Sequence, residues 1–110
     1  MPRRAVVRGV GHYLPERVVP NSWFEDKIDT SDEWIRSRSG IENRHFAADG
    51  ETTSDLASKA AEAALAASGL SASDMDALIV ATSTADLTFP SAATMVQHRI
   101  VQAFVQNESH

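Results

Sequence analysis

An uninterrupted apolar run, from Ala77 to Ala81, restricts the possible folds of this chain more than any other feature. Five apolar residues in a row are typical of a strand that is buried on both faces, as the central strands of α/β sheets are. Such a strand needs neighbouring strands for its backbone groups and a covering layer on each face. Polar residues 82–86 follow it, at the strand end where ligands gather in open α/β sheets.

Helical patterns lie on both sides of this run. The longest predicted helix covers residues 54–68, with Thr52 as its cap, Asp55 in its first turn and Gly69 just past its end. One of its faces carries mainly small side chains, which suits close packing against a sheet or another helix. These residues are Leu56, Ala60, Ala63, Ala64 and Ala67.

A further helix is predicted to begin with Pro90 at its first position, where the fixed φ of proline is favourable. Its apolar face consists of Ala92, Val96 and Ile100. Beyond Arg99 the pattern is open to a short strand over residues 101–105, followed by a polar tail. Strand, helix, buried strand and helix in this order predict an α/β fold with a single core.

The first strand of that series is predicted at residues 5–10, which include three valines. Gly9 and Gly11 next to it admit two interpretations, a dinucleotide-binding loop or a plain turn. The third glycine of the dinucleotide motif is missing, and Pro15 lies close to where its helix would begin. A turn is therefore favoured.

Two short helices are predicted between residues 21 and 40. Asn21 and Ser22 are the candidate caps of a helix through Ile28. Thr30 and Glu33 form a candidate capping box for the second helix, which Gly40 would end.

On the second helix, Trp34 and Arg38 are four residues apart and therefore share a face. A guanidinium beside an indole suits the binding of a flat ligand, although spacing alone favours simple packing of the indole against a loop. Arg36, Arg38 and Arg44 concentrate positive charge in this part of the chain. That concentration suits a phosphorylated aromatic ligand, or it is a solvated surface with weak ion pairs.

Composition excludes several classes of function. The net charge of −5 argues against binding to nucleic acid or to a membrane surface, and no apolar run is long enough to span a membrane. There is no cysteine, so disulfides, thiolate metal sites and cysteine nucleophiles are excluded within these residues. The four histidines lack the spacing of a helical metal site, and no Gly-x-Ser-x-Gly motif occurs. Without a visible targeting segment, a cytoplasmic location is expected.

Several strings in sequence order carry a family resemblance. They are Gly9-Val10-Gly11-His12-Tyr13-Leu14-Pro15-Glu16, Asp29-Thr30-Ser31-Asp32-Glu33-Trp34-Ile35-Arg36-Ser37-Arg38-Ser39-Gly40-Ile41, Glu42-Asn43-Arg44-His45, Glu51-Thr52-Thr53-Ser54-Asp55-Leu56-Ala57, Ile79-Val80-Ala81-Thr82-Ser83-Thr84 and Phe89-Pro90-Ser91-Ala92-Ala93. From about Val7 to Arg99, the chain resembles the amino-terminal part of β-ketoacyl-[acyl-carrier-protein] synthase III.

The resemblance implies a thiolase-like fold, of which residues 1–110 are an incomplete amino-terminal part with a divergent tail at 100–110. It implies a homodimer that condenses an acyl-CoA primer, often acetyl-CoA, with malonyl-acyl-carrier protein to start fatty-acid synthesis. Acyl-CoA is then a substrate, and no cofactor is expected. Thr30, Trp34 and Arg38 match positions that contact coenzyme A, with Trp34 stacking on adenine. Phe89 matches a residue that lines the acyl pocket across the dimer interface.

The sequence departs from the family where a strand and the catalytic cysteine should follow the last helix. Only a weak match, Ala103-Phe104, stands at that strand, and the cysteine, histidine and asparagine of the family's active site are missing. We therefore expect a truncated synthase that is inactive alone. Two other hypotheses remain: a non-catalytic coenzyme A-binding or dimerisation module, and another acyl-CoA-condensing enzyme of the thiolase superfamily.

Overall fold

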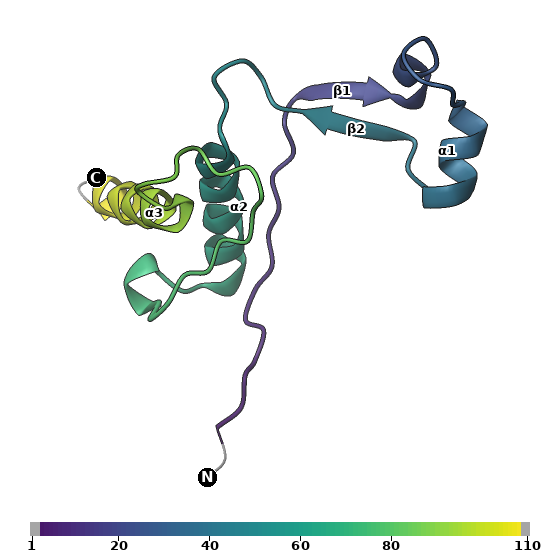
Figure 1. The fold of residues 1–110 in the computed structure, drawn as a ribbon. Coiled ribbons are helices and arrows are strands. Elements are labelled where there is room, and N and C mark those ends of the chain that lie inside the picture. Colours follow the sequence, from purple (N-terminus) through teal and green to yellow (C-terminus); the bar gives the residue numbers. More distant parts are fainter. Residues whose placement is uncertain (1–2, 109–110) are drawn as a thin grey trace. The chain divides into compact units, whose positions relative to one another are not determined.

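The structure, a computed structural model, describes residues 3–108 and consists of two compact units (Figure 1). One unit spans residues 14–50, and the other combines the amino-terminal segment with the chain from residue 51 onward. The elements are β1 (Arg17–Pro20), the 3₁₀ helix η1 (Asn21–Phe24), α1 (Asp32–Ser39), β2 (Asn43–Phe46), α2 (Thr53–Ser68), the 3₁₀ helix η2 (Ala72–Asp74) and α3 (Ala92–Glu108). Each unit is described by itself.

The unit of residues 14–50 is built on an antiparallel pair of short strands, β1 and β2. Their register places Arg17 opposite Phe46 and Pro20 opposite Asn43. The ring of Trp23 meets the rings of Phe24 and Phe46 edge to face, at centroid distances of 4.8 and 5.5 Å. Such pairs are favourable beyond the apolar area they bury, so this cluster stabilises a unit with little other core.

The two helices of this unit differ from the prediction at their starts. The first is only the single turn η1, and Pro20 rather than Asn21 or Ser22 precedes it as the cap. In α1 the capping residue is Ser31, one position after Thr30, and its Oγ accepts from the Trp34 amide at 3.1 Å. Gly40 ends α1 in the left-handed conformation, as predicted.

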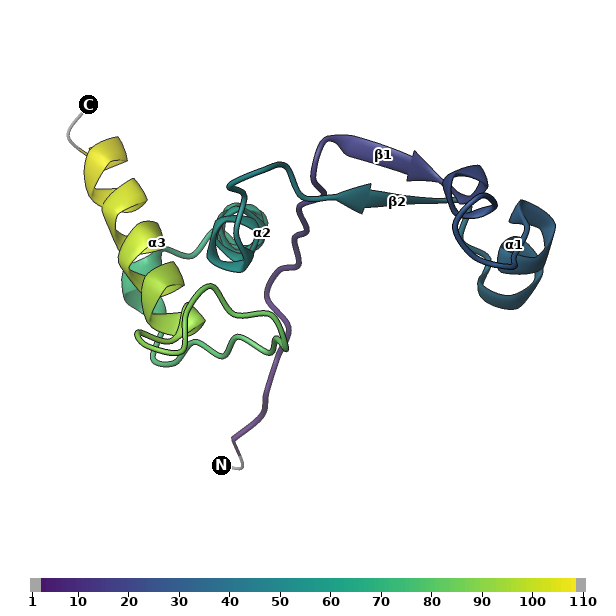
Figure 2. The same ribbon diagram turned by 45° about the horizontal axis from the view of Figure 1, so that its top comes forward.

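The second unit has α2 and α3 at its centre, and the two helices cross (Figures 1 and 2). The predicted start and end of α2 are confirmed: Thr52 and Asp55 form a capping box, and Gly69 closes the helix with a φ of 74°. Buried Leu65 of α2 packs with Ala72, Val96 and Ile100. The predicted apolar face of the last helix is therefore the face that forms the core.

The start and the length of α3 were predicted incorrectly. Ser91 rather than Pro90 directly precedes the helix, and its Oγ accepts from the Thr94 amide at 3.2 Å. The helix then continues through residues 101–105, so the alternative of a short strand there, including Ala103-Phe104, is wrong. Among the described residues no strand lies beside this segment for pairing, whereas a helix satisfies its own backbone. His110, at the end of the predicted tail, lies outside the described residues.

The two predicted strands of this unit do not form among the described residues. Residues 5–10 and 77–81 have no strand partner, and neither segment makes a backbone hydrogen bond to another described residue. Val80 packs against the core, but Ile79 next to it is 89% exposed. Residues 77–81 therefore have the sequence of a central strand, but among the described residues they lack the neighbouring strands that a central strand requires.

Gly9 and Gly11 form neither a nucleotide loop nor a turn. They lie in an extended segment against α2, so close that a Cβ on Gly9 would be 2.8 Å from the Ala64 carbonyl oxygen. A Cβ on Gly11 would overlap the backbone of Ala63 and Ala64. The small-residue face of α2 thus receives the amino-terminal segment, while α3 packs on the side that carries Leu65.

Adding one methyl group at Gly11 tests this contact. We expect Gly11→Ala to lower the free energy of unfolding by about 1–3 kcal/mol, because the added carbon meets backbone that cannot move aside. Urea unfolding followed by circular dichroism measures the loss. Val10→Ala is the matched control, since Val10 is 76% exposed and lies between the two glycines. Equal midpoints for the two variants would contradict the tight contact.

Candidate functional site

The exposed side chains of Trp34 and Arg38 form a pair on α1. The Arg38 guanidinium carbon lies 5.6 Å from the centroid of the indole, within the range of a cation–π interaction. The predicted shared face is therefore confirmed. Trp34 is 56% exposed, and it extends into solvent rather than into the aromatic cluster of its unit. An indole held this way offers a flat apolar surface with a positive charge beside it.

A buried asparagine fixes the helix that carries this pair. Asn21 is 1% exposed, and its Nδ2 donates to Asp32 Oδ1 at 2.9 Å and to the Ile41 carbonyl at 2.7 Å. Its Oδ1 accepts from an Arg44 Nη2 at 2.8 Å. The Asn21 side chain thus links Asp32, the first residue of α1, and Ile41, which follows α1, to Arg44 of β2. Sequence reasoning treated Asn21 as a helix cap, because hydrogen bonds between distant residues leave no periodic signal.

The predicted cluster of three arginines does not gather around the indole. Arg36 forms an ion pair with Asp32 at 3.0 Å, one turn earlier on α1. Arg44 lies over the ring of Phe24, 4.5 Å from its centroid, besides its bond to Asn21. Only Arg38 of the three is placed beside Trp34, so the positive charge at this face is smaller than predicted.

Thr30 precedes α1, but its hydroxyl does not cap this helix, because Ser31 is the capping residue. Among the described residues, Thr30 Oγ1 is buried and has no hydrogen-bond partner. A buried hydroxyl in this state costs about 1–3 kcal/mol, which a partner would recover. Arg44 Nη1 is the other buried, unpartnered polar atom described in this unit, and each of the two would gain from a new hydrogen-bond partner.

Phe89 belongs to the other unit, and its side chain is 85% exposed. It stands just before α3, at the end of the loop that follows the apolar run. Its ring contacts no other ring or cation within the described residues. An exposed phenylalanine of this kind has a large apolar surface that the unit itself does not cover.

The loop that contains Asp86 is attached to the start of α2. Asp86 Oδ1 accepts from the Ser54 amide at 2.8 Å, and Oδ2 accepts from the Ser54 hydroxyl at 2.6 Å. Ser54 is completely buried, and the neighbouring Thr53 hydroxyl donates to the Thr84 carbonyl. The polar loop that the sequence indicated as a ligand site therefore uses its carboxylate to satisfy a helix end.

The described histidines do not form a metal site. Within residues 3–108, no three His, Cys, Asp or Glu side chains gather in a way that could hold a metal ion. His45 makes a hydrogen bond through Nδ1 to the Pro15 carbonyl at 2.6 Å, and His12 and His98 are exposed.

None of the helices in this part of the chain has the length and hydrophobicity that crossing a membrane requires.

Solved structures share this fold. The priming β-ketosynthase of the R1128 polyketide pathway superimposes with a TM-score of 0.78 at 33% identity, over 86% of this chain and 28% of that one. The 3-oxoacyl-[acyl-carrier-protein] synthase III of Aquifex aeolicus gives 0.77 at 43% identity, over 84% of this chain and 30% of that one. The fold is therefore that of the thiolase-like ketosynthases, over the part that the chain covers.

Sequence comparison identifies which of the thiolase-like ketosynthases this chain is similar to. The chain is 76% identical over 100 residues to β-ketoacyl-[acyl-carrier-protein] synthase III of Ruegeria pomeroyi, and 75% identical over 95 residues to that of Paracoccus denitrificans. These matches include 91% and 86% of this chain. The chain is a homologue of the amino-terminal portion of β-ketoacyl-[acyl-carrier-protein] synthase III, and it spans about 30% of the length of these relatives. No protein-family model matches it.

Acidification is expected to detach the loop that carries Asp86. The hydrogen bonds from Ser54 lower the pKa of Asp86 below its ordinary value of 3.8. A carboxylate whose pKa is lowered by folding contributes stability above its unfolded pKa, and this contribution is lost as the pH falls through the folded value. The attachment is therefore complete at neutral pH and disappears below pH 3.8.

The pH dependence of the free energy of unfolding measures this effect, with Asp86→Asn as the control that cannot titrate. The variant should lose stability at neutral pH and approach the wild-type protein in acid. Two parallel pH profiles would show that Asp86 makes no titrating contribution.

Proposed function

We propose that this chain is part of an enzyme that condenses an acyl-CoA primer, such as acetyl-CoA, with malonyl-acyl-carrier protein and releases carbon dioxide. The 76% identity to a β-ketoacyl-[acyl-carrier-protein] synthase III is the observation that carries the proposal. The role of this chain in that enzyme is to bind the coenzyme A part of the primer. A homodimer in the cytoplasm, with no cofactor besides its substrates, belongs to the same proposal.

Trp34 and Arg38 are proposed as the adenine-facing side of the coenzyme A site. The exposed indole offers a stacking surface of the size of a purine, and stacking on it removes apolar area of both rings from water. Arg38 beside it adds a cation that attracts the phosphates of coenzyme A. The buried, unpartnered hydroxyl of Thr30 is proposed to bond to the ligand after rotation of its side chain.

The exposed ring of Phe89 is proposed to line the acyl pocket of the partner subunit in the homodimer. Its 85% exposure supports this role, because an uncovered phenylalanine favours a protein or ligand contact. The chain contains no cysteine, so the nucleophile that accepts the acyl group has to come from polypeptide beyond these residues.

A non-catalytic coenzyme A-binding or dimerisation module is the second candidate, because binding through Trp34 and Arg38 needs no catalytic residue. Another acyl-CoA-condensing enzyme of the thiolase superfamily is a third reading of the same fold. Sequencing the coding DNA beyond His110 separates the module from the two enzymes, because only an enzyme needs a downstream cysteine. Binding of coenzyme A is common to the two enzymes and to a coenzyme A-binding module, whereas a dimerisation module does not need it.

Replacement of Trp34 by alanine is expected to weaken coenzyme A binding by about 1–2 kcal/mol, since stacking on the indole is lost. Calorimetric titration with coenzyme A measures the affinities of the wild-type protein and of Trp34→Ala, and fluorescence tests the contact with Trp34 itself. In a Trp23→Phe background, which keeps a ring in the aromatic cluster, Trp34 is the only indole. Coenzyme A should quench its emission.

Arg38→Ala should weaken this binding, and Arg36→Ala is the matched control. Both changes remove one positive charge from α1, but only Arg38 lies beside the indole. Equal effects of the two variants would show that Arg38 acts only through its positive charge and not through its place beside the indole. Unchanged affinity in Trp34→Ala would show that adenine stacks elsewhere.

Incubation with labelled acetyl-CoA is expected to leave no acyl group bound to this chain. Transfer of an acyl group from a thioester needs an activated nucleophile, and these 110 residues offer no thiolate. Intact-protein mass spectrometry detects an acetyl adduct directly. A stable adduct would show that a serine, lysine or histidine of this chain accepts the acyl group.

A further inference from the structure

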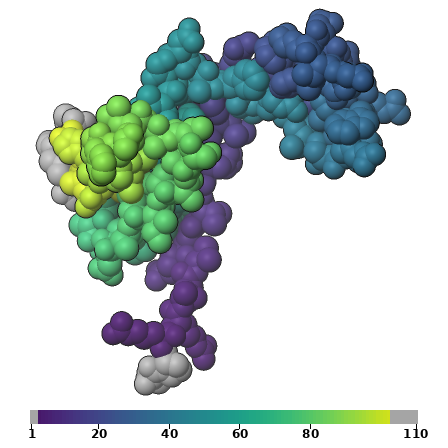
Figure 3. All heavy atoms as spheres, viewed as in Figure 1, coloured from purple at the N-terminus to yellow at the C-terminus, as the bar shows by residue number. Residues whose placement is uncertain are grey.

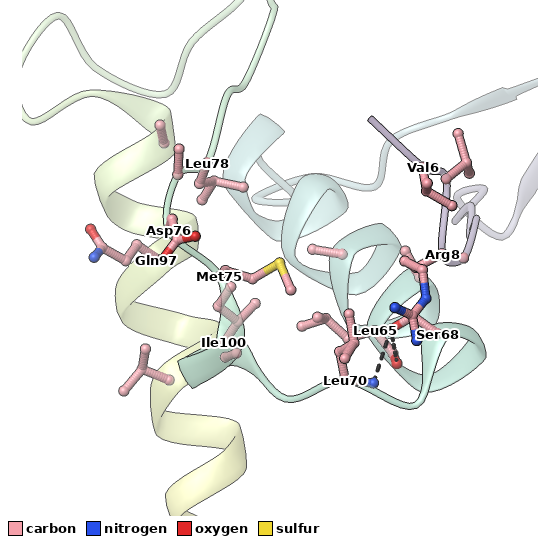
Figure 4. Close-up of a pocket in the computed structure, with 18 of the residues that line it drawn as sticks. Val6, Arg8, Leu65, Ser68, Leu70, Met75, Asp76, Leu78, Gln97 and Ile100 are labelled. Carbon is pink, nitrogen blue, oxygen red and sulfur yellow. Dashed lines mark hydrogen bonds between the residues drawn. The ribbon is translucent and has the colours of Figure 1, made fainter. Parts of the chain in front are cut away.

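The helix α1 has no buried side chain that holds it in its unit. None of its eight residues is buried, and its atoms, blue in Figure 3, lie at the edge of the unit in that view. The helices of the other unit differ, because buried Leu65 of α2 and Ile100 of α3 belong to one apolar core and line the groove in Figure 4. Since a helix of eight residues is not stable in isolation, the place of α1 depends mainly on polar contacts.

These polar contacts hold α1 at both ends. At its start, Glu25 Oε1 accepts from the Asp32 amide at 3.0 Å, and Asn21 Nδ2 donates to the Asp32 carboxylate. Just past its end, the same Nδ2 donates to the Ile41 carbonyl. One buried side chain, that of Asn21, therefore bonds at both ends of the helix that carries the candidate site.

Arg44 determines which way the Asn21 amide faces. A guanidinium only donates, whereas the Ile41 carbonyl and the Asp32 carboxylate only accept. The bond from Arg44 Nη2 to Asn21 Oδ1 therefore directs Nδ2, with its two hydrogens, to the two acceptors at the ends of α1. Arg44 itself lies over the ring of Phe24, which belongs to the aromatic cluster. The guanidinium thus connects that cluster to the amide that holds α1.

We propose that Asn21 and Arg44 are positioning residues for coenzyme A binding, because they hold α1 in the orientation in which its indole and guanidinium receive the adenine. Asn21 is 1% exposed and Arg44 faces Phe24, so both act through α1. A surface that is fixed before binding loses less conformational freedom when the ligand arrives, which raises its affinity. This inference rests on the proposed function and adds the residues through which the unit supports that site.

Asn21→Asp tests the bonds at the two ends of α1. The change replaces the donating Nδ2 by an oxygen, which faces the Asp32 carboxylate and the Ile41 carbonyl as a third acceptor. Calorimetric titration should show that coenzyme A binds about tenfold more weakly, since both bonds are lost. Asn43→Asp is the matched control, because it makes the same change at an exposed asparagine of the same unit. It should weaken binding much less.

Arg44→Met tests the orientation of the Asn21 amide, with Arg17→Met as the matched control. Arg44 and Arg17 lie over two rings of one aromatic cluster, Phe24 and Phe46, but of the two only Arg44 donates to Asn21. Only Arg44→Met should therefore weaken coenzyme A binding. The loss should persist in about 1 M sodium chloride, where attraction between a distant arginine and the phosphates of coenzyme A is screened.

Two measurements without ligand separate positioning from a general loss of folding. Amide hydrogen exchange should become faster in α1 of Asn21→Asp and Arg44→Met, whereas the paired amides of β1 and β2 and those of α2 should keep their protection. In the Trp23→Phe background, the fluorescence anisotropy of Trp34 should fall in both variants, because the indole moves with a loosened helix.

The outcomes separate this inference from the proposed function. Wild-type affinity in both variants, losses equal to those of the controls, or a loss in Arg44→Met that disappears in high salt would overturn the positioning roles. Faster exchange in β1, β2 and α1 together would also overturn them, because the two residues would then stabilise the whole unit. If the wild-type protein does not bind coenzyme A, the proposed function fails. Exchange and anisotropy then decide alone whether the two residues hold α1, and unchanged values overturn that too.

Discussion

An extended segment becomes a strand only when a neighbour satisfies its backbone N–H and C=O groups, and this dependence shapes both units. β1 and β2 lie close in sequence and pair with each other. Residues 5–10 and 77–81 have equally strong strand sequences but no pairing partner among the described residues. Helices do not have this dependence, because their hydrogen bonds are internal. The helices α2 and α3 therefore form, whereas the two predicted strands of the same unit do not form among the described residues.

Local signals predicted the cap of α2 and the carboxyl-terminal ends of α1 and α2, whereas interactions between distant residues escaped prediction. The cap at Thr52 and the glycines that end α1 and α2 were readable because each acts within a few residues. Asn21 and the bond between Ser54 and Asp86 were not readable, because their partners lie 11 to 32 residues away. The predicted arginine cluster was wrong for the same reason. Side chains of like charge that are close in sequence suggest a cluster, but their separate partners place them apart.

The candidate site was only partly accessible to sequence reasoning. The spacing of Trp34 and Arg38 predicted their shared face, and the structure places the guanidinium beside the ring. Without the family resemblance, two interpretations of this pair remained: a ligand-binding surface, or ordinary packing of the indole against a loop. The family resemblance supplied the ligand, and the strong exposure of Trp34 agrees with a surface kept open. The α/β class was predicted from the order of strands and helices and the thiolase-like fold from the family resemblance, although the apolar run is not paired within the described residues.

The carboxylate of Asp55 serves two purposes. It completes the capping box with Thr52 and also forms an ion pair with Arg99 of α3. Hydrogen bonds from Thr52 are the main reason that the pKa of Asp55 is lowered, and Arg99 adds to them. The first turn of α2 and the position of α3 are thus thermodynamically coupled through one side chain. Fraying of that turn also breaks the ion pair to α3, so an opening at the start of α2 weakens the contact between the two helices that the apolar core provides.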